Sequence, residues 1–161
     1  MNNITYTPIG IIYSPFKEPK GMPIQPKGAK DIEGSVEIFE KYIKGLQNLD
    51  GFSHIILLYH FHLSKEYSLT VKPYLDNNSR GVFATRAPSR PNAIGLSVVK
   101  LEKIEKNIIH IKNVDIVDGT PVLDIKPYVP QFNPDEEFKI GWLKENISKL
   151  NQTKGDDRFN N

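Results

Sequence analysis

Short apolar segments with a period of two residues dominate this chain, and they restrict it to a fold built mainly from β-strands. Apolar side chains recur at every second position, or in short runs, between clusters of Gly, Pro, Asn and Asp. Such alternation places one face of each segment against a core and the other against solvent. The pattern predicts about seven or eight short strands at regular spacing, which favours a single closed or nearly closed β-barrel.

The expected elements follow from this pattern and from the turn residues between them. We expect strands at residues 4–13, 34–39, 52–63, 81–85, 94–104, 108–114, 114–117 and 122–125, with a hairpin turn at residues 105–107. Apolar residues at helical spacing predict a short helix over residues 40–49 and a longer helix that begins at Asp135. Residues 1–134 are therefore predicted to form one barrel domain, and residues 135–161 a C-terminal helix with a flexible polar tail.

The composition excludes several classes of protein. The 161 residues include no cysteine, so the chain has no disulfide and no thiolate nucleophile. Neither the dinucleotide-binding nor the P-loop glycine motif occurs, and no nucleophile-elbow motif surrounds Ser89 or Ser97. The first residues lack the features of a signal peptide and no apolar stretch is long enough to span a membrane, so we expect a cytoplasmic protein. The net charge of +2 does not by itself identify an anionic partner.

Arginine is concentrated in one segment of the chain. Three of the four arginines, Arg80, Arg86 and Arg90, fall within eleven residues, whereas seventeen lysines are spread over the rest of the sequence. Arginine offers a planar set of donors that binds carboxylates and phosphates with two hydrogen bonds, which lysine does not. Pro88 and Pro91 stiffen the same segment. The sequence therefore predicts a rigid loop between two strands that binds anionic groups.

Three histidines on the predicted strand at residues 52–63 suggest a second chemistry. His54, His60 and His62 share one face by alternation, a spacing that metal sites in β-barrels use. A further ligand would have to come from elsewhere in the chain, and the candidates are Asp115, Asp118 and Asp124. Hydrogen-bonded histidines in a pocket wall explain the pattern more simply, so we expect no metal and keep a metal-dependent hydrolase as an alternative.

Acidic residues surround one tight turn near the end of the predicted barrel. Asp118 begins the turn at residues 118–121, Asp115 precedes it, and Asp124 interrupts the apolar strand that follows. By alternation Asp124 shares its face with Lys126. The turn alone explains Asp118, whereas Asp124 is a candidate for chemistry or for a solvent-facing position.

Ordered motifs make this chain similar to a known family. Residues 81–97 read GVFATRAPSRPNAIGLS and residues 118–128 read DGTPVLDIKPY, and residues 9–17, 23–26 and 46–54 match in the same order. Together they resemble the TrmO family, also called YaeB or TsaA-like, over about residues 7–130. Ala87 and Ala93 stand where the common form of the arginine motif has a serine and a proline.

The resemblance implies a fold, a reaction and partners. It implies a β-barrel tRNA methyltransferase that is unrelated to the Rossmann methyltransferases and that works as a homodimer. The implied cofactor is S-adenosylmethionine, and the implied acceptor is N6 of N6-threonylcarbamoyladenosine at position 37, beside the anticodon. Bacterial relatives carry an extra C-terminal domain, so here the barrel, the final helix or the dimer is expected to hold the anticodon loop. A barrel that binds RNA without catalysis remains an alternative.

The resemblance also suggests the regions of the site, and the chemistry suggests the roles within them. The residues expected to bind the cofactor are Gln25, Pro26, Lys27, Gly28, His62, Leu63, Arg86, Leu96, Val122, Leu123, Asp124 and Ile125. Arg86 is expected to bind a carboxylate and Leu96 to pack against the adenine. The residues expected to act at the reacting nitrogen are Asn92 and either Asp118 or Asp124, as proton acceptor or orienting group. Arg80, Arg90 and Lys100 are expected to contact the RNA.

Overall fold

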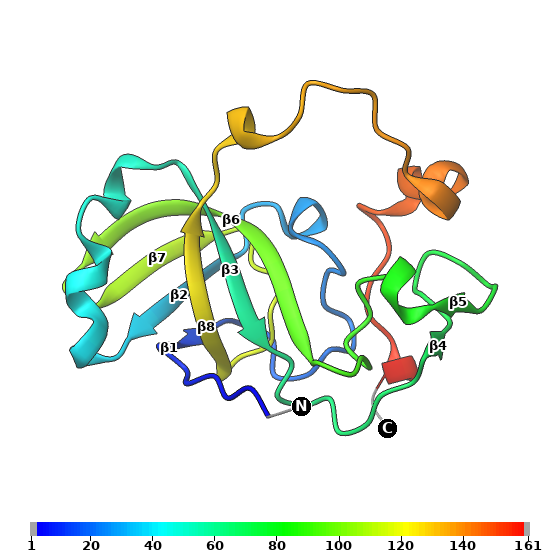
Figure 1. Cartoon of the computed structure of the whole chain (residues 1–161), viewed down its shortest axis with the longest axis horizontal. Coiled ribbons are helices and arrows are strands. Elements are labelled where there is room, and N and C mark those ends of the chain that lie inside the picture. The colour runs from blue at the N-terminus through cyan, green and yellow to red at the C-terminus, as the bar shows by residue number, and fades with distance from the viewer. Residues whose placement is uncertain (1–2, 160–161) are drawn as a thin grey trace.

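The computed structural model describes residues 3–159, and these form a closed antiparallel barrel with a smaller region beside it (Figure 1). The barrel strands, in spatial order, are β1 (Gly10–Tyr13), β2 (Glu33–Ile38), β7 (Ile108–Lys112), β6 (Ile94–Glu105), β3 (His54–His60) and β8 (Thr120–Pro127). Strand β1 closes the barrel because it pairs with both β2 and β8, so that Gly10 lies opposite Ile38 on one side and Val122 on the other. Closure leaves no unpaired strand edge in the barrel.

The smaller region contains a two-stranded sheet of β4 (Thr70–Val71) and β5 (Arg80–Gly81). All helical segments of the described residues are 3₁₀ helices: η1 (Pro26–Ala29), η2 (Glu40–Leu46), η3 (Leu49–Gly51), η4 (Val82–Ala84), η5 (Pro130–Phe132), η6 (Gly141–Glu145), η7 (Ile147–Lys149) and η8 (Asp157–Phe159). None of these segments within residues 3–159 is long and apolar enough to cross a membrane.

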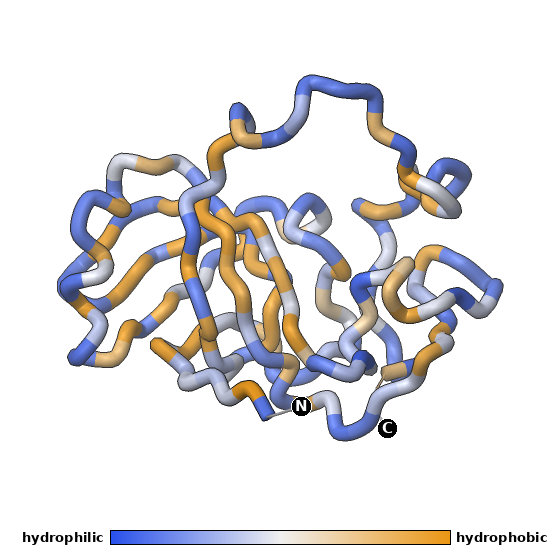
Figure 2. The backbone as a smooth tube through the Cα atoms, viewed as in Figure 1, coloured by the Kyte–Doolittle hydropathy of each residue, from blue (hydrophilic) through white to orange (hydrophobic). Residues whose placement is uncertain are grey.

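The barrel interior is the hydrophobic core that the alternation predicts. In β3, Ile55, Leu57 and Tyr59 point inward and are buried, while the residues between them lie on the outer side. Figure 2 shows apolar residues along the barrel strands. The same alternation on the other strands adds Ile12, Val36, Ile38, Val99, Leu101, Ile109, Ile111 and Val122, and the segment between β7 and β8 adds Val114 and Ile116. Burying one such aliphatic side chain contributes about 1.5–3 kcal/mol, so this core is the main stabilising element of the fold.

The predicted fold class and most predicted strands are confirmed, but three strand predictions need correction. The first strand begins at Gly10 rather than at residue 4, since only residues 10–13 pair with neighbours. Residues 82–84 form the 3₁₀ helix η4 instead of a strand. Residues 114–117 are irregular, and the first three are buried; the Val114 amide donates to the Ile32 carbonyl, and the carbonyls of Ile116 and Val117 accept from the hydroxyls of Ser14 and Thr120. The hairpin between β6 and β7 turns at Lys106 in the left-handed conformation, as predicted for residues 105–107.

The C-terminal part differs most from its prediction. No α-helix begins at Asp135; residues 133–140 are exposed, and only the short turns η6 and η7 follow. Gly141 has a φ of 55°, a left-handed conformation that interrupts a right-handed helix at this point. Residues 153–159, which the sequence assigns to a flexible tail, contact the loop at residues 19–25 through the backbone and the carbonyls of Lys72 and Pro73 through Arg158. The helix predicted at residues 40–49 is present as η2 and η3.

Candidate functional site

A cleft of about 410 Å³ opens between one end of the barrel and the loops beside it. Four separate parts of the chain form most of its lining: the loop at residues 19–25, the end of β3 with the residues that follow, the arginine loop at residues 85–96, and the irregular segment at residues 115–120. Tyr74, Gly155 and Phe159 complete it. The volume is in the range of small-molecule sites, and the lining combines apolar walls with a few polar groups, as such sites require.

A buried polar network lies at the floor of this cleft. The Ser97 hydroxyl, which is fully buried, donates a hydrogen bond of 2.7 Å to Asp115 Oδ1. The Tyr59 hydroxyl lies 3.1 Å from Ser97 Oγ, and since that serine donates to the carboxylate, the tyrosine donates to the serine. Asp115 and Tyr59 both line the cleft. The three side chains therefore form a directed chain that ends on a carboxylate facing the cleft.

Burial dominates the electrostatics of this carboxylate. Loss of hydration raises the pKa of Asp115 to about 6, although the hydrogen bond from Ser97 and the nearby charge of Arg86 act in the opposite direction. Burial likewise raises the pKa of the Tyr59 hydroxyl, which therefore stays protonated and acts as a donor. A buried carboxylate without a full ion pair is costly, and this makes Asp115 a candidate functional group.

Glycine at position 95 makes room for the tyrosine of the network. Gly95 on β6 pairs with Tyr59 on β3, and a Cβ at position 95 would lie 2.2 Å from the Tyr59 ring. The ring therefore lies directly over the glycine backbone, from where its hydroxyl reaches Ser97. The motif at residues 81–97 therefore supplies this close packing contact at Gly95 in addition to Arg86 and Arg90.

The three clustered arginines have different surroundings. Arg86 lines the cleft and its Nη1 donates to Gln25 Oε1 at 3.1 Å, which links the two loops on either side of the opening. Arg90 also lines the cleft, but its Nη1 donates to the backbone carbonyls of Thr85 and Ala87 and so braces the loop. Arg86 is thus the arginine with most of its donors available to a bound anion.

Arg80 is used structurally. Its guanidinium forms an ion pair of 2.6 Å with Asp76 and lies 5.7 Å from the centre of the Trp142 ring. The indole in turn donates to the carbonyl of Ala84 at 2.8 Å. Arg80 does not line the cleft, and its contact with RNA stays a prediction.

The histidines do not gather into a metal site. His54 and His60 are on the outer side of β3, whereas His62 lies beyond the strand end and its Nδ1 is 3.2 Å from Thr120 Oγ1. Burial lowers the pKa of His62, and so does the neighbouring His60, so the ring in the cleft wall is neutral at neutral pH. Within residues 3–159, no group of three or more histidine, aspartate or glutamate side chains is placed to hold a metal ion.

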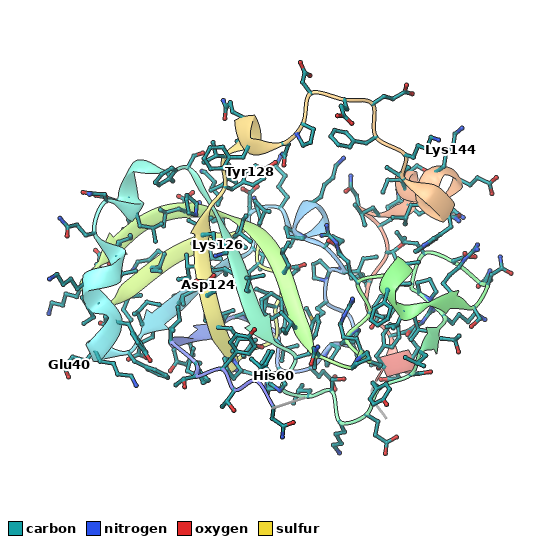
Figure 3. All side chains as sticks on the ribbon, in the orientation of Figure 1. Glu40, His60, Asp124, Lys126, Tyr128 and Lys144 are labelled. Carbon is teal, nitrogen blue, oxygen red and sulfur yellow. The ribbon has the colours of Figure 1, made fainter. Side chains whose placement is uncertain are left out.

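The two aspartates predicted to act at the reacting nitrogen lie outside the cleft lining. Asp118 accepts hydrogen bonds from the Ser14 amide at 3.0 Å and from Lys17 Nζ at 2.6 Å, and so holds the loop after β1. Asp124 lies on β8, where it forms a 2.7 Å ion pair with Lys126 (Figure 3). Each carboxylate therefore has hydrogen-bond or ion-pair partners of its own outside the cleft.

The remaining predicted residues divide into two groups. The residues that the structure brings together in the cleft lining are Gln25, His62, Leu63, Arg86, Arg90, Asn92 and Leu96. The residues that do not line it are Pro26, Lys27, Gly28, Lys100, Val122, Leu123 and Ile125. Val122 is fully buried in the barrel core, and Lys100 forms an ion pair of 2.6 Å with Glu102.

The sequence reasoning missed the role of the buried network. It treated Asp115 only as a possible metal ligand and Ser97 only as a nucleophile without a motif. One signal was present, because Asp115 stands inside the apolar run at residues 114–117. A carboxylate in such a run is buried unless the segment is a surface strand, and buried carboxylates need partners.

Comparison with known proteins identifies the family. The family model of the tRNA-methyltransferase O N-terminal domain matches residues 11–134. The chain belongs to the tRNA-methyltransferase O family. It is 58% identical over 156 residues to a probable S-adenosyl-L-methionine-binding protein of Pyrococcus abyssi. The matched region covers 97% of this chain and 85% of that protein. It is 38% identical over 138 residues to the human tRNA (adenine(37)-N6)-methyltransferase, covering 81% of this chain and 31% of the human protein.

The barrel also agrees with a solved structure of the family. The crystal structure of TrmO from Pseudomonas aeruginosa superposes with a TM-score of 0.72 at 38% identity, over 88% of this chain and 63% of that chain. This chain thus spans less than two thirds of the Pseudomonas TrmO chain. The predicted family and fold class are confirmed. The predicted enzyme class and the predicted cofactor, S-adenosylmethionine, agree with the descriptions of these relatives.

Proposed function

We propose that this TrmO-family chain transfers a methyl group from S-adenosylmethionine to N6 of N6-threonylcarbamoyladenosine at position 37 of a tRNA. One observation supports this proposal most: Arg86 of the arginine loop and the buried Asp115 line the same cleft of about 410 Å³. The cleft thus carries a cationic and an anionic side chain close to apolar walls. A zwitterionic cofactor with an apolar, aromatic part has the complementary chemistry.

The charged residues fit the amino-acid part of the cofactor. The Arg86 guanidinium is suited to the carboxylate, because its planar donors bind two oxygens at once. Asp115 is suited to the ammonium group, since a cation would neutralise a carboxylate that the fold leaves buried. Gln25 holds Arg86 in place by their hydrogen bond. In this arrangement the buried network orients Asp115 rather than reacting.

The walls of the cleft fit the adenosine part. Phe61, Leu63 and Leu96 supply apolar surface, and Phe61 packs edge-to-face against Tyr59 with ring centres 5.4 Å apart. Neutral His62 adds a hydrogen-bonding group at the same wall. This is the usual composition of a nucleoside site, with aromatic and aliphatic contacts and few polar groups.

The acceptor nucleotide fits the open side of the cleft. Arg90 and Asn92 line both the cleft and a second hollow on the outside of the barrel, which Lys65 and the exposed rings of Tyr6 and Tyr67 also line. Aromatic side chains next to a positive charge are the usual surface for single-stranded nucleotides. We therefore place the anticodon loop over this hollow, with position 37 directed past Asn92 into the cleft.

Positioning is the main contribution of the protein to the reaction. When bound, S-adenosylmethionine would supply an electrophilic methyl group on its sulfonium; transfer to N6 would leave S-adenosylhomocysteine and release the N6 proton to solvent. That nitrogen is a weak nucleophile, because its lone pair is shared with the purine and the carbamoyl group. Holding two reactants in line can remove about 7–11 kcal/mol from the activation barrier of the uncatalysed reaction. The residues that fix this alignment are Arg86 and Asp115 on the cofactor side and Asn92 on the acceptor side.

Nucleoside mass spectrometry tests the reaction directly. Purified protein is incubated with tRNA that carries threonylcarbamoyladenosine and with S-adenosylmethionine labelled in its methyl group. We expect the label in the threonylcarbamoyladenosine peak and not in unmodified adenosine. Label in another nucleoside would contradict the acceptor, and S-adenosylmethionine binding without any transfer would favour a barrel that binds RNA without this catalysis.

The affinity for S-adenosylmethionine should depend on pH through Asp115. In the free protein this carboxyl is protonated below its pKa of about 6, and a bound ammonium favours the ionised form. Affinity should therefore be constant above that pH and fall by up to about tenfold for each unit below it. Calorimetry between pH 5 and pH 8 at constant salt measures this. His62 and Arg86 also face the cleft, so the Asp115→Asn variant is needed to isolate the contribution of Asp115. This variant should lose the fall in affinity below about pH 6.

The oligomeric state of the protein and its place in the cell stay predictions. A homodimer and a cytoplasmic site follow from the family resemblance and from the tRNA substrate. Several large apolar side chains are exposed on the segment that follows β8, namely Phe132, Phe138 and Ile140, and these suit a contact with a second copy. We include the dimer in the proposed function on this basis.

A further inference from the structure

A C-terminal segment, residues 153–159, lies between two loops that line the cleft, and we call it the C-terminal strap. In Figure 1 it is the red end of the chain, which passes between the barrel and the region of β4 and β5. The family model of the N-terminal domain matches residues 11–134, so the strap lies beyond the residues that this model matches. Its contacts with the cleft loops are specific enough to suggest a role in the site.

The first loop, at residues 19–25, is joined to the strap through the backbone. Gly21 N donates to Gly155 O and Gly155 N donates to Met22 O, each at 2.8 Å, and Lys154 forms a β-bridge with Pro23. Gly155 is buried, and a Cβ at this position would lie 2.3 Å from the carbonyl oxygen of Pro19. Only glycine allows the two backbones to approach this closely.

The second loop, at residues 71–75, is joined to the strap through side chains. Arg158 donates to the carbonyl of Pro73 at 2.7 Å, and its guanidinium lies 5.0 Å from the centre of the Tyr74 ring. Asp156 holds this guanidinium with hydrogen bonds of 2.6 to 3.0 Å. The ring of Phe159 packs edge-to-face on Tyr74 with centres 5.0 Å apart. The strap thus fixes the position of an aromatic pair.

These contacts place strap residues in the wall of the cofactor cleft. Gly155, Phe159 and Tyr74 all line the cleft, and the loop fixed by Gly155 carries Gln25, the hydrogen-bond partner of Arg86. We propose that the C-terminal strap is a functional part of the cofactor site, in which Phe159 and Tyr74 form one apolar wall and Gly155 positions the Gln25 loop. This inference rests on the proposed function, because it takes S-adenosylmethionine to be the ligand of the cleft.

Substitutions at two strap positions test the proposal, each with a matched control variant. Gly155→Ala adds a methyl group against a backbone oxygen, whereas Gly45→Ala adds one where nothing lies within 4 Å. Phe159→Ala removes a ring from the cleft wall, whereas Phe52→Ala removes an exposed ring outside it. Affinity for S-adenosylmethionine is measured by calorimetry, and the melting temperature of the ligand-free protein is measured alongside.

We expect affinity to fall about tenfold or more for Gly155→Ala and Phe159→Ala, and to stay within about twofold of wild type for both controls. Phe159→Tyr should restore most of the affinity, since it keeps the ring; this variant separates a wall contact from general loss of structure. Phe159→Ala should lower the melting temperature only modestly, because Phe159 packs against the small cluster of Val71, Val82 and Ala87 and not against the barrel core.

Equal affinities in wild type, Gly155→Ala and Phe159→Ala would overturn the role of the strap while leaving the proposed function intact. If Phe159→Tyr binds as weakly as Phe159→Ala, the wall contact is wrong. Wild-type protein that does not bind S-adenosylmethionine at all would overturn the proposed function itself, and the inference with it.

Discussion

Replacing Asp115 by asparagine is expected to abolish tight binding of S-adenosylmethionine and, at the same time, to stabilise the empty protein. Asparagine keeps the shape of the side chain and can still accept the hydrogen bond from Ser97. It removes the charge that we propose as the partner of the cofactor ammonium. Removing one partner of a buried charge pair costs about 2–5 kcal/mol, so affinity should fall by about 30-fold or more.

The gain in stability follows from the raised pKa of Asp115. Its carboxyl titrates near 3.8 in an unfolded chain and near about 6 in the folded protein, because burial disfavours the charge. A pKa that is raised in the folded state means that stability is greatest below pH 4 for this group and declines as the pH rises through 6. Above that range the carboxylate lowers the free energy of unfolding by up to about 3 kcal/mol, at about 1.4 kcal/mol per pKa unit. Asparagine carries no such cost.

Chemical denaturation at pH 8 and calorimetry with S-adenosylmethionine measure the two effects. Asp118→Asn and Asp124→Asn are the matched controls, because each removes a carboxylate of the same region that lies outside the cleft. Both should bind the cofactor nearly as well as wild type. An Asp115→Asn protein with unchanged affinity, or a large loss of affinity in the Asp124→Asn control, would show that the ammonium contact has been assigned to the wrong carboxylate.

Replacing Arg86 by alanine should weaken S-adenosylmethionine binding by about 10- to 100-fold with little change in stability. A hydrogen bond to a charged group is worth about 1.5–3 kcal/mol, which corresponds to this range. Within residues 3–159 the guanidinium donates a hydrogen bond to the Gln25 side chain alone, and Arg86 is not part of the barrel core. The loss should therefore appear in affinity rather than in the melting temperature.

Two lysine variants make the Arg86 prediction specific. Arg86→Lys keeps the charge but loses the planar pair of donors, so its affinity should lie between those of wild type and Arg86→Ala. Arg80→Lys is the matched control in the same segment, since Arg80 is paired with Asp76 away from the cleft lining. It should bind the cofactor normally. Full affinity in Arg86→Ala would remove the carboxylate contact from the proposed site.

The period-two alternation of apolar residues predicted the barrel strands well, because every second residue of a strand faces the core and is buried. Ile55, Leu57 and Tyr59 alternate with outward residues in the sequence and in the structure alike. The same approach failed for the C-terminal helix, where spacing at Phe138 and Trp142 looked helical. There the left-handed Gly141 and the contact of Trp142 with Ala84 decide the conformation, and neither is visible in spacing.

The sequence predicted part of the candidate site, because some of its residues lie in one continuous motif and others do not. Arg86, Asn92 and Leu96 stand in one continuous motif, so the resemblance located them together. Asp115 stands outside that motif, and only the fold brings it to Ser97, eighteen residues earlier in the chain. The choice among the three aspartates of residues 115–124 depends on burial, which differs among neighbours that look equivalent in the sequence.

Alternation, composition and ordered motifs are local properties, so the amino-acid sequence is enough to establish the mostly-β class, the lack of thiol chemistry and the family. The tertiary structure alone decided which arginine is available to a ligand, which aspartate is buried at the cleft floor, and that the chain end packs beside the cleft. Each of these depends on contacts between distant segments, such as the Ser14 hydroxyl with the Ile116 carbonyl or Arg158 with Pro73. Burial and hydrogen-bond partners set the charge state and the role of a side chain, and they exist only once the barrel has closed.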